Sequence, residues 1–138
     1  MTWFVKGATG LILLAFIAAC TSDISMPGPR EGEGVFLDNC AACHGVRGEG
    51  GELIGGQTAP DLTLIAARSD GELPVAEVLS KIDGYGQGHS TDQVMPEFGA
   101  LFAGETVPVD VDGTLTPTPR PLAALLAYLE SVQRPLEG

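Results

Sequence analysis

The residues best suited to chemistry lie in one pentapeptide, Cys40-Ala41-Ala42-Cys43-His44. Two cysteines separated by two residues can each form a thioether with one of the two vinyl groups of a haem. A histidine directly after them can bind the iron through an imidazole nitrogen. Because the porphyrin dictates this spacing, the motif predicts one covalently bound haem c, attached through Cys40 and Cys43, with His44 as an iron ligand.

Two other kinds of site use part of this pattern. A structural disulfide or a thioredoxin-like redox pair needs the same spacing of cysteines but not the histidine, and no βαβ pattern surrounds the motif. A zinc site needs further Cys or His ligands. Once Cys20 is assigned to a lipid, as argued below, only His89 remains to complete such a site. We therefore favour haem attachment over both alternatives.

Short helices must position the motif. Residues 34–40 predict a helix that leads into it, and Gly45 and Gly48 end the helical stretch. Residues 74–83 predict a second, amphipathic helix with apolar residues on one face and Gly84 after its end.

The clearest predicted helix is C-terminal. Pro119 and Pro121 suit its first turn, and Pro135 stops it. Its apolar residues recur at helical spacing and are Leu122, Leu125, Leu126, Leu129 and Val132.

The motif and its helices together resemble the class I, mitochondrial-like cytochromes c, which carry a single haem. In that family a glycine eight residues before the first motif cysteine and an aromatic residue four before it cross the C-terminal helix. Gly32 and Phe36 stand at these positions. The resemblance implies Leu125 and Tyr128 as their partners, although two aromatic residues can equally be generic parts of a core. It implies an all-α cytochrome c fold, with three to five short helices around one covalent haem.

The same resemblance implies two further site residues. Pro60 lies in a stretch, 55–62, that resembles the family's proline-containing loop, whose carbonyl accepts a hydrogen bond from the histidine ligand. A simple turn proline is the alternative. Met95, followed by Pro96, resembles the methionine-bearing loop that supplies the sixth iron ligand, and His89 on the same loop is the competitor. A thioether sulfur favours ferrous iron, so His/Met ligation raises the reduction potential over His/His ligation.

The segment 104–118, before the C-terminal helix, is longer than in the smallest members of that family. Alternating valines followed by Asp112-Gly113 predict a small hairpin or an Ω-like loop. Asp110 and Asp112 resemble the start of a calcium loop, but its remaining ligand positions are missing. We expect a longer loop or hairpin here, and we consider it a candidate contact surface for a partner.

The N-terminus predicts export. Lys6 precedes an apolar run, 11–19, which is too short to span a bilayer and is typical of a signal peptide. The run ends in Ile-Ala-Ala-Cys at residues 17–20, which resembles the lipobox of bacterial lipoproteins. That resemblance implies cleavage before Cys20 and lipid attachment to it. An ordinary secretory leader that ends near a cysteine is the alternative.

These features divide the chain into three parts. We expect a lipoprotein-type signal peptide at 1–19, a flexible Gly- and Pro-rich tether at 20–31 and a cytochrome c domain at 32–138. The predicted location is the periplasm, with the protein anchored to a bacterial membrane through its lipid.

The charge balance narrows the choice of partners. The chain has 18 acidic and 7 basic residues, a formal net charge of -11. This argues against nucleic acid or an anionic lipid surface as a partner, because both require a basic face. An acidic surface would steer the protein toward a basic patch on a redox donor or acceptor, or it serves solubility alone.

The sequence therefore predicts an electron-transfer protein rather than an enzyme. Two axial ligands leave no open position for oxygen, peroxide or a substrate, which suits a one-electron carrier. Three alternatives stay open. They are a haem-bearing subunit of a larger dehydrogenase or oxidase complex, a peroxidase-like haem domain, and a non-redox lipoprotein whose cysteines form only a disulfide.

Overall fold

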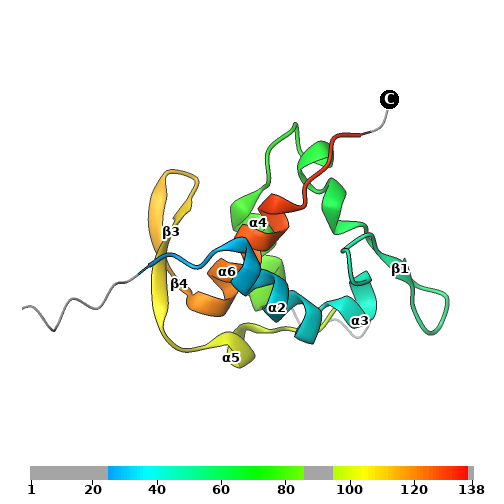
Figure 1. Cartoon of the computed structure of the whole chain (residues 1–138), viewed down its shortest axis with the longest axis horizontal. Coiled ribbons are helices and arrows are strands. Elements are labelled where there is room, and N and C mark those ends of the chain that lie inside the picture. The colour runs from blue at the N-terminus through cyan, green and yellow to red at the C-terminus, as the bar shows by residue number, and fades with distance from the viewer. Residues whose placement is uncertain (1–24, 86–94, 137–138) are drawn as a thin grey trace, which may run out of the picture.

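The computed structural model describes residues 25–85 and 95–136 (Figure 1). This part of the chain is mainly helical, with α2 (Pro29–Asn39), α3 (Ala41–His44), α4 (Val75–Asp83), α5 (Gly99–Phe102) and α6 (Arg120–Ser131). Two short 3-10 helices, η2 (Leu62–Leu64) and η3 (Ala66–Arg68), lie between α3 and α4. The strands form two antiparallel pairs, β1 (Gly51–Glu52) with β2 (Thr58–Ala59) and β3 (Thr106–Val111) with β4 (Thr114–Pro119).

Helices α2 and α6 pack against each other at the centre of the core (Figure 1). No side chain separates them at Gly32, where a Cβ atom would overlap the Ala124 carbonyl and lie 2.8 Å from Cβ of Tyr128. One turn later Phe36 is 1% exposed, and its ring centroid lies 5.0 Å from that of Tyr128. The predicted crossing of Gly32 and Phe36 with the C-terminal helix is confirmed. Leu125, about 100° further round α6 than Ala124, is buried in the same core as Phe36, and both residues line a cavity.

Helix α2 begins at Pro29, earlier than predicted and inside the expected tether 20–31. Proline suits a first helical turn because its φ is already helical and its missing N–H needs no partner there. In the same turn Glu31 forms an ion pair with Arg120 of α6, with 2.8 Å between Oε1 and Nε. Arg120 also donates to the Ser25 carbonyl at 2.9 Å. Helix α2 therefore starts three residues before the expected start of the domain at residue 32.

Helices α4 and α6 lie almost where the sequence places them. Helix α4 buries Val78, Leu79 and Ile82 and ends at Asp83. The next residue, Gly84, has a left-handed φ of 90°, and its N–H donates to the Ser80 carbonyl. This is the common glycine ending of a helix. Helix α6 has a proline in its first turn and buries the predicted Leu122, Leu125, Leu126 and Leu129. Val132 lies one residue beyond its end and is partly buried.

Strands β3 and β4 form a hairpin whose two-residue turn is Asp112-Gly113. Both turn residues have positive φ, 51° and 83°, which matches the twist of the flanking strands. On the inner face of β3, Val107 is 1% exposed and Val109 is 6% exposed, and both belong to the core that includes α6. Of the two structures expected for this segment, the hairpin is confirmed.

Several predicted features lie outside the described residues. They are the signal peptide 1–19, the predicted lipid attachment residue Cys20, the first part of the tether (20–24), and His89. Within residues 25–85 and 95–136, none of the helices has the length and apolar character needed to cross a bilayer.

Candidate functional site

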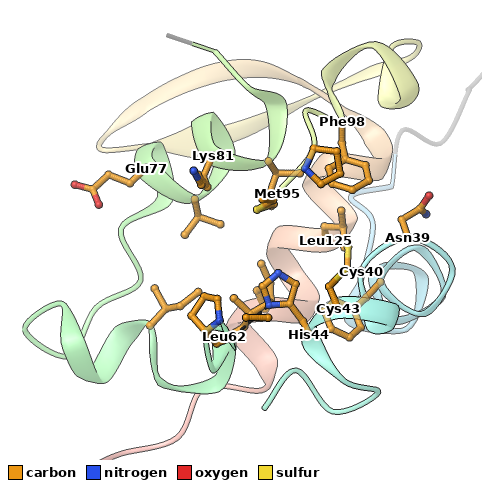
Figure 2. Close-up of a pocket in the computed structure, with 18 of the residues that line it drawn as sticks. Asn39, Cys40, Cys43, His44, Leu62, Glu77, Lys81, Met95, Phe98 and Leu125 are labelled. Carbon is orange, nitrogen blue, oxygen red and sulfur yellow. Dashed lines mark hydrogen bonds between the residues drawn. The ribbon is translucent and has the colours of Figure 1, made fainter. Parts of the chain in front are cut away.

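A cavity of about 430 Å³ lies beside the packed helices α2 and α6 (Figure 2). Its volume is within the range of cofactor and small-molecule pockets. The walls are mostly apolar and come from α2, α4, α6 and the segments on either side of α4, among them Phe36, Leu62, Ile65, Val78, Ile82 and Leu125. The predicted site residues within the described ranges all line this one cavity. They are Cys40, Cys43, His44, Pro60 and Met95.

His44 forms one wall of the cavity (Figure 2). It is the last residue of α3 and is 8% exposed. Its Nδ1 lies 3.2 Å from the Pro60 carbonyl oxygen, as the proline loop predicted. Nδ1–H therefore donates to this carbonyl, and Nε2 carries the lone pair that can bind a metal. The main-chain carbonyl of His44 accepts from the Gly50 N–H at 2.8 Å, so the proline loop holds the ring and the loop after the motif holds the backbone.

Cys40 and Cys43 lie at the rim of the cavity, beside His44 (Figure 2). Cys40 joins α2 to α3, and its carbonyl accepts from the N–H groups of Cys43 and His44 at 3.1 and 2.9 Å. Burial, reinforced by the neighbouring Cys43, raises the pKa of the Cys40 thiol to about 11. Nucleophilic redox cysteines have lowered pKa values. The surroundings of Cys40 therefore give no support to a thioredoxin-like pair.

Met95 lies on the opposite wall, across the cavity from His44 (Figure 2). The segment that follows it is fixed to α4, because the Phe98 N–H donates to the Ile82 carbonyl at 2.9 Å. The Phe98 ring also stacks on Phe102 of α5, with 5.7 Å between the ring centroids. Two segments far apart in the sequence thus bring an imidazole and a thioether to opposite sides of one apolar space.

Polar side chains line another part of the cavity. Glu77 and Lys81 extend from α4, away from the cysteines (Figure 2). Arg68 and Ser69 come from the end of η3, and Arg68 Nη2 donates to the Asp61 carbonyl at 2.6 Å. The cavity therefore combines an apolar interior with a partly charged edge.

Residues 29–133 match the family Cytochrome c. The chain belongs to the cytochrome c family. No match was found among curated proteins or among solved structures. Membership confirms the predicted fold class, a mainly helical cytochrome c domain in which the first and last helices of the domain pack together. It also makes the chain a c-type haem protein of a family whose members are typically electron carriers rather than enzymes.

The cavity of this cytochrome c domain fits a haem. Its walls are apolar, a nitrogen and a sulfur donor face each other across it, and two thiols stand beside the nitrogen donor. A haem needs apolar contacts over its faces and polar partners for its carboxylates, and the charged edge can provide the latter. The Cys40–Cys43 pair is consistent with covalent haem c. In the described parts of the chain, no group of three or more His, Cys, Asp and Glu side chains could hold a metal ion.

Sequence reasoning missed the charged edge of the cavity. Arg68 and Lys81 are two of only 7 basic residues in an acidic chain, and this scarcity was the available signal. Lys81 also follows Val78 by one turn and precedes Ile82, so it lies next to the buried face of α4. Neither signal says which cavity the side chain borders, because that depends on how α4 packs.

Proposed function

We propose that this chain is a one-electron carrier in which Cys40 and Cys43 hold one haem c covalently and His44 and Met95 bind its iron. The observation that carries the proposal is the position of His44 and Met95 on opposite walls of one apolar cavity, with the cysteine pair at its rim. When bound, the haem supplies the redox couple, and the protein supplies its ligands and its surroundings.

The way both donors are held supports electron transfer rather than catalysis. The His44 ring is fixed by the Pro60 carbonyl, and its backbone is fixed by Gly50. The segment after Met95 is anchored to α4 through Phe98. Because the protein fixes both iron ligands, they would move little when the iron changes its oxidation state. With both ligands bound, the iron would have no open position for oxygen or a substrate. The soft sulfur of Met95 would favour the reduced state.

Replacement of Met95 tests the ligation. Met95→Ala should abolish the charge-transfer band between sulfur and ferric iron, and the reduced variant should bind carbon monoxide at neutral pH, which the wild type should not. Met26→Ala is a matched control, because Met26 is 52% exposed and does not line the cavity. If Met95→Ala keeps the wild-type spectrum and His89→Ala changes it, the sixth ligand is His89 instead.

The covalent attachment has a separate test. The pyridine haemochrome spectrum of protein made in a host competent in cytochrome maturation should show two thioether links, and Cys43→Ala should show one. A colourless wild-type protein would contradict the proposal at its foundation.

We further infer that the chain is a lipoprotein, anchored through Cys20 on the periplasmic side of a bacterial membrane. The support is the lipobox-like sequence at residues 17–20, and residues 21–28 would then separate the domain from the membrane. Wild-type protein should require detergent for extraction, and Cys20→Ala should move the haem to the soluble periplasmic fraction. If both proteins extract without detergent, the anchor does not exist.

Its redox partners would present a basic patch. The net charge of -11 supports this, because attraction between opposite charges speeds encounter. The rate of electron exchange with such a partner should fall steeply as ionic strength rises, since salt screens exposed charges. A rate independent of salt would assign the acidic surface to solubility alone.

A further inference from the structure

Gln133 lies just beyond the last turn of α6 and bonds to the segment that follows Pro60. Its Oε1 accepts from the Ala66 N–H at 2.8 Å, and its Nε2 donates to the Leu62 carbonyl at 2.9 Å. The same Nε2 donates to the Leu129 carbonyl of α6 at 2.7 Å. One amide side chain thus ties the end of α6 to the first residues of η2 and η3.

Arg134 adds a second set of bonds to the same segment. Its N–H donates to the Thr63 carbonyl at 2.8 Å, and its Nε donates to the Thr63 hydroxyl at 2.9 Å. Its Nη2 lies 3.3 Å from Oδ2 of Asp61. Thr63 is 3% exposed, and its hydroxyl and N–H both donate to Oδ1 of Asp61, at 2.6 and 2.8 Å. The turn directly after Pro60 is therefore held through the Asp61 carboxylate and through the N–H, carbonyl and hydroxyl groups of Thr63.

The loop after the haem motif holds this turn from the other side. The Leu62 N–H donates to the Gly48 carbonyl at 2.7 Å. Gly50 approaches so closely that a Cβ there would overlap the Ala59 carbonyl and lie 2.9 Å from the carbonyl carbon of Pro60. The residues that follow Pro60 are thus bonded to the motif loop on one side and to the end of α6 on the other.

We propose that Gln133 and Arg134 are positioning residues that hold the Pro60 carbonyl against Nδ1 of His44 and so set how strongly His44 donates to the iron. This inference rests on the proposed ligation by His44. A hydrogen bond from the far ring nitrogen fixes the orientation of an imidazole and makes it a stronger donor. A stronger donor stabilises the ferric state, so loosening the Pro60 segment raises the reduction potential.

The test uses haem-loaded protein with Gln133→Met, which keeps the length of the side chain but loses its hydrogen bonds, and with Arg134→Ala. Both variants should have a higher reduction potential than the wild type. In both variants, the Nδ1 proton of His44 should exchange with solvent on the order of tenfold faster. This is the ratio expected when local opening of the Pro60 segment has to break about one hydrogen bond fewer. Arg134→Lys keeps a charge near Asp61 and should shift both quantities less, in the same direction.

Arg120→Gln is the matched control. It removes the ion pair with Glu31 that ties the other end of α6 to α2. It should lower thermal stability while leaving the reduction potential and the exchange of the His44 proton unchanged.

One result would contradict the positioning role of Gln133 and Arg134, and another would contradict iron ligation by His44. If the Gln133 and Arg134 variants lose stability as Arg120→Gln does but keep the wild-type potential and exchange rate, their role is structural only and the inference fails. If the His44 ring in ferric wild-type protein shows no paramagnetic shift in its NMR signals, the ligation itself fails and the proposed function fails with it.

Discussion

Gly32 of α2 lies against the backbone of Ala124 in α6, so closely that any side chain at position 32 would overlap the Ala124 carbonyl. This contact sets the separation of the two helices. Phe36 from α2 and Leu125 from α6 both line the haem cavity, whereas Gly32 does not. The shape of the cavity therefore depends on a residue outside its walls.

Gly32→Ala should destabilise the protein. The added methyl group must push the helices apart, and overpacking of this kind costs about 1–3 kcal/mol. Guanidinium unfolding of the haem-loaded protein measures the change. Gly34→Ala is the control on the same helix, because a Cβ at Gly34 meets nothing within 4 Å. There alanine should stabilise by about 0.5–1 kcal/mol, since it favours a helix over glycine. Equal effects at the two positions would disprove the close contact.

Gly50→Ala should loosen the bond between Pro60 and His44. Gly50 has φ +77°, and its Cβ would overlap the Ala59 carbonyl, so both backbone strain and collision oppose a side chain. We expect the free energy of unfolding to fall by about 1–3 kcal/mol. Thermal melting of the haem-loaded protein measures this change. Gly51→Ala, where a Cβ meets nothing within 4 Å, should change stability by less than about 0.5 kcal/mol. A wild-type melting curve for Gly50→Ala would refute the argument.

Asp61 should make stability depend on acid pH. Desolvation acts to raise the pKa of its carboxyl, but hydrogen bonds from the Thr63 hydroxyl and N–H, with the charges of Arg134 and Arg68, hold that pKa below its ordinary value. A carboxyl whose pKa is lower in the folded state stabilises fully above its unfolded pKa, about 4. This contribution is lost as the pH falls through the folded pKa.

Two substitutions of Asp61 separate the contribution of its negative charge to stability from that of its helix cap. Asp61 caps η2, so Asp61→Ala should cost about 1 kcal/mol at pH 7, and the cost should shrink toward about pH 2. Asp61→Asn retains the cap acceptor and should cost less. Urea unfolding at both pH values gives the comparison. A cost of Asp61→Ala that is the same at the two pH values would rule out the contribution of the charge.

The hairpin before α6 should prove to be part of the core. Val107→Ala removes buried apolar atoms and should cost about 1–3 kcal/mol in urea unfolding. Leu115 on β4 is 70% exposed, and Leu115→Ala should change stability by less than about 0.5 kcal/mol. If both substitutions are neutral, the hairpin does not pack as described. Its role as a partner-contact surface stays a prediction.

The cofactor and two helices could be predicted from the sequence because their signals are local. The thioether cysteines and the first iron ligand lie within five consecutive residues, and the haem itself dictates their spacing. The apolar period of α6 and the glycine after α4 act within a few turns of chain, so both helices lie within about two residues of their predicted bounds. The turn Asp112-Gly113 is local in the same way.

Only the tertiary structure decided which side chains meet. The contact of Gln133 with Ala66 spans 67 residues, and the ion pair of Arg120 with Glu31, at the early start of α2, spans 89. The assignment of Leu125 to the cavity, and the burial of Val107 that selected a hairpin over an Ω-like loop, depend equally on how distant elements pack. The physical reason is that these contacts gain their free energy from burial and hydrogen bonding between segments far apart in the chain, and a local pattern of residue types carries no record of its distant partner.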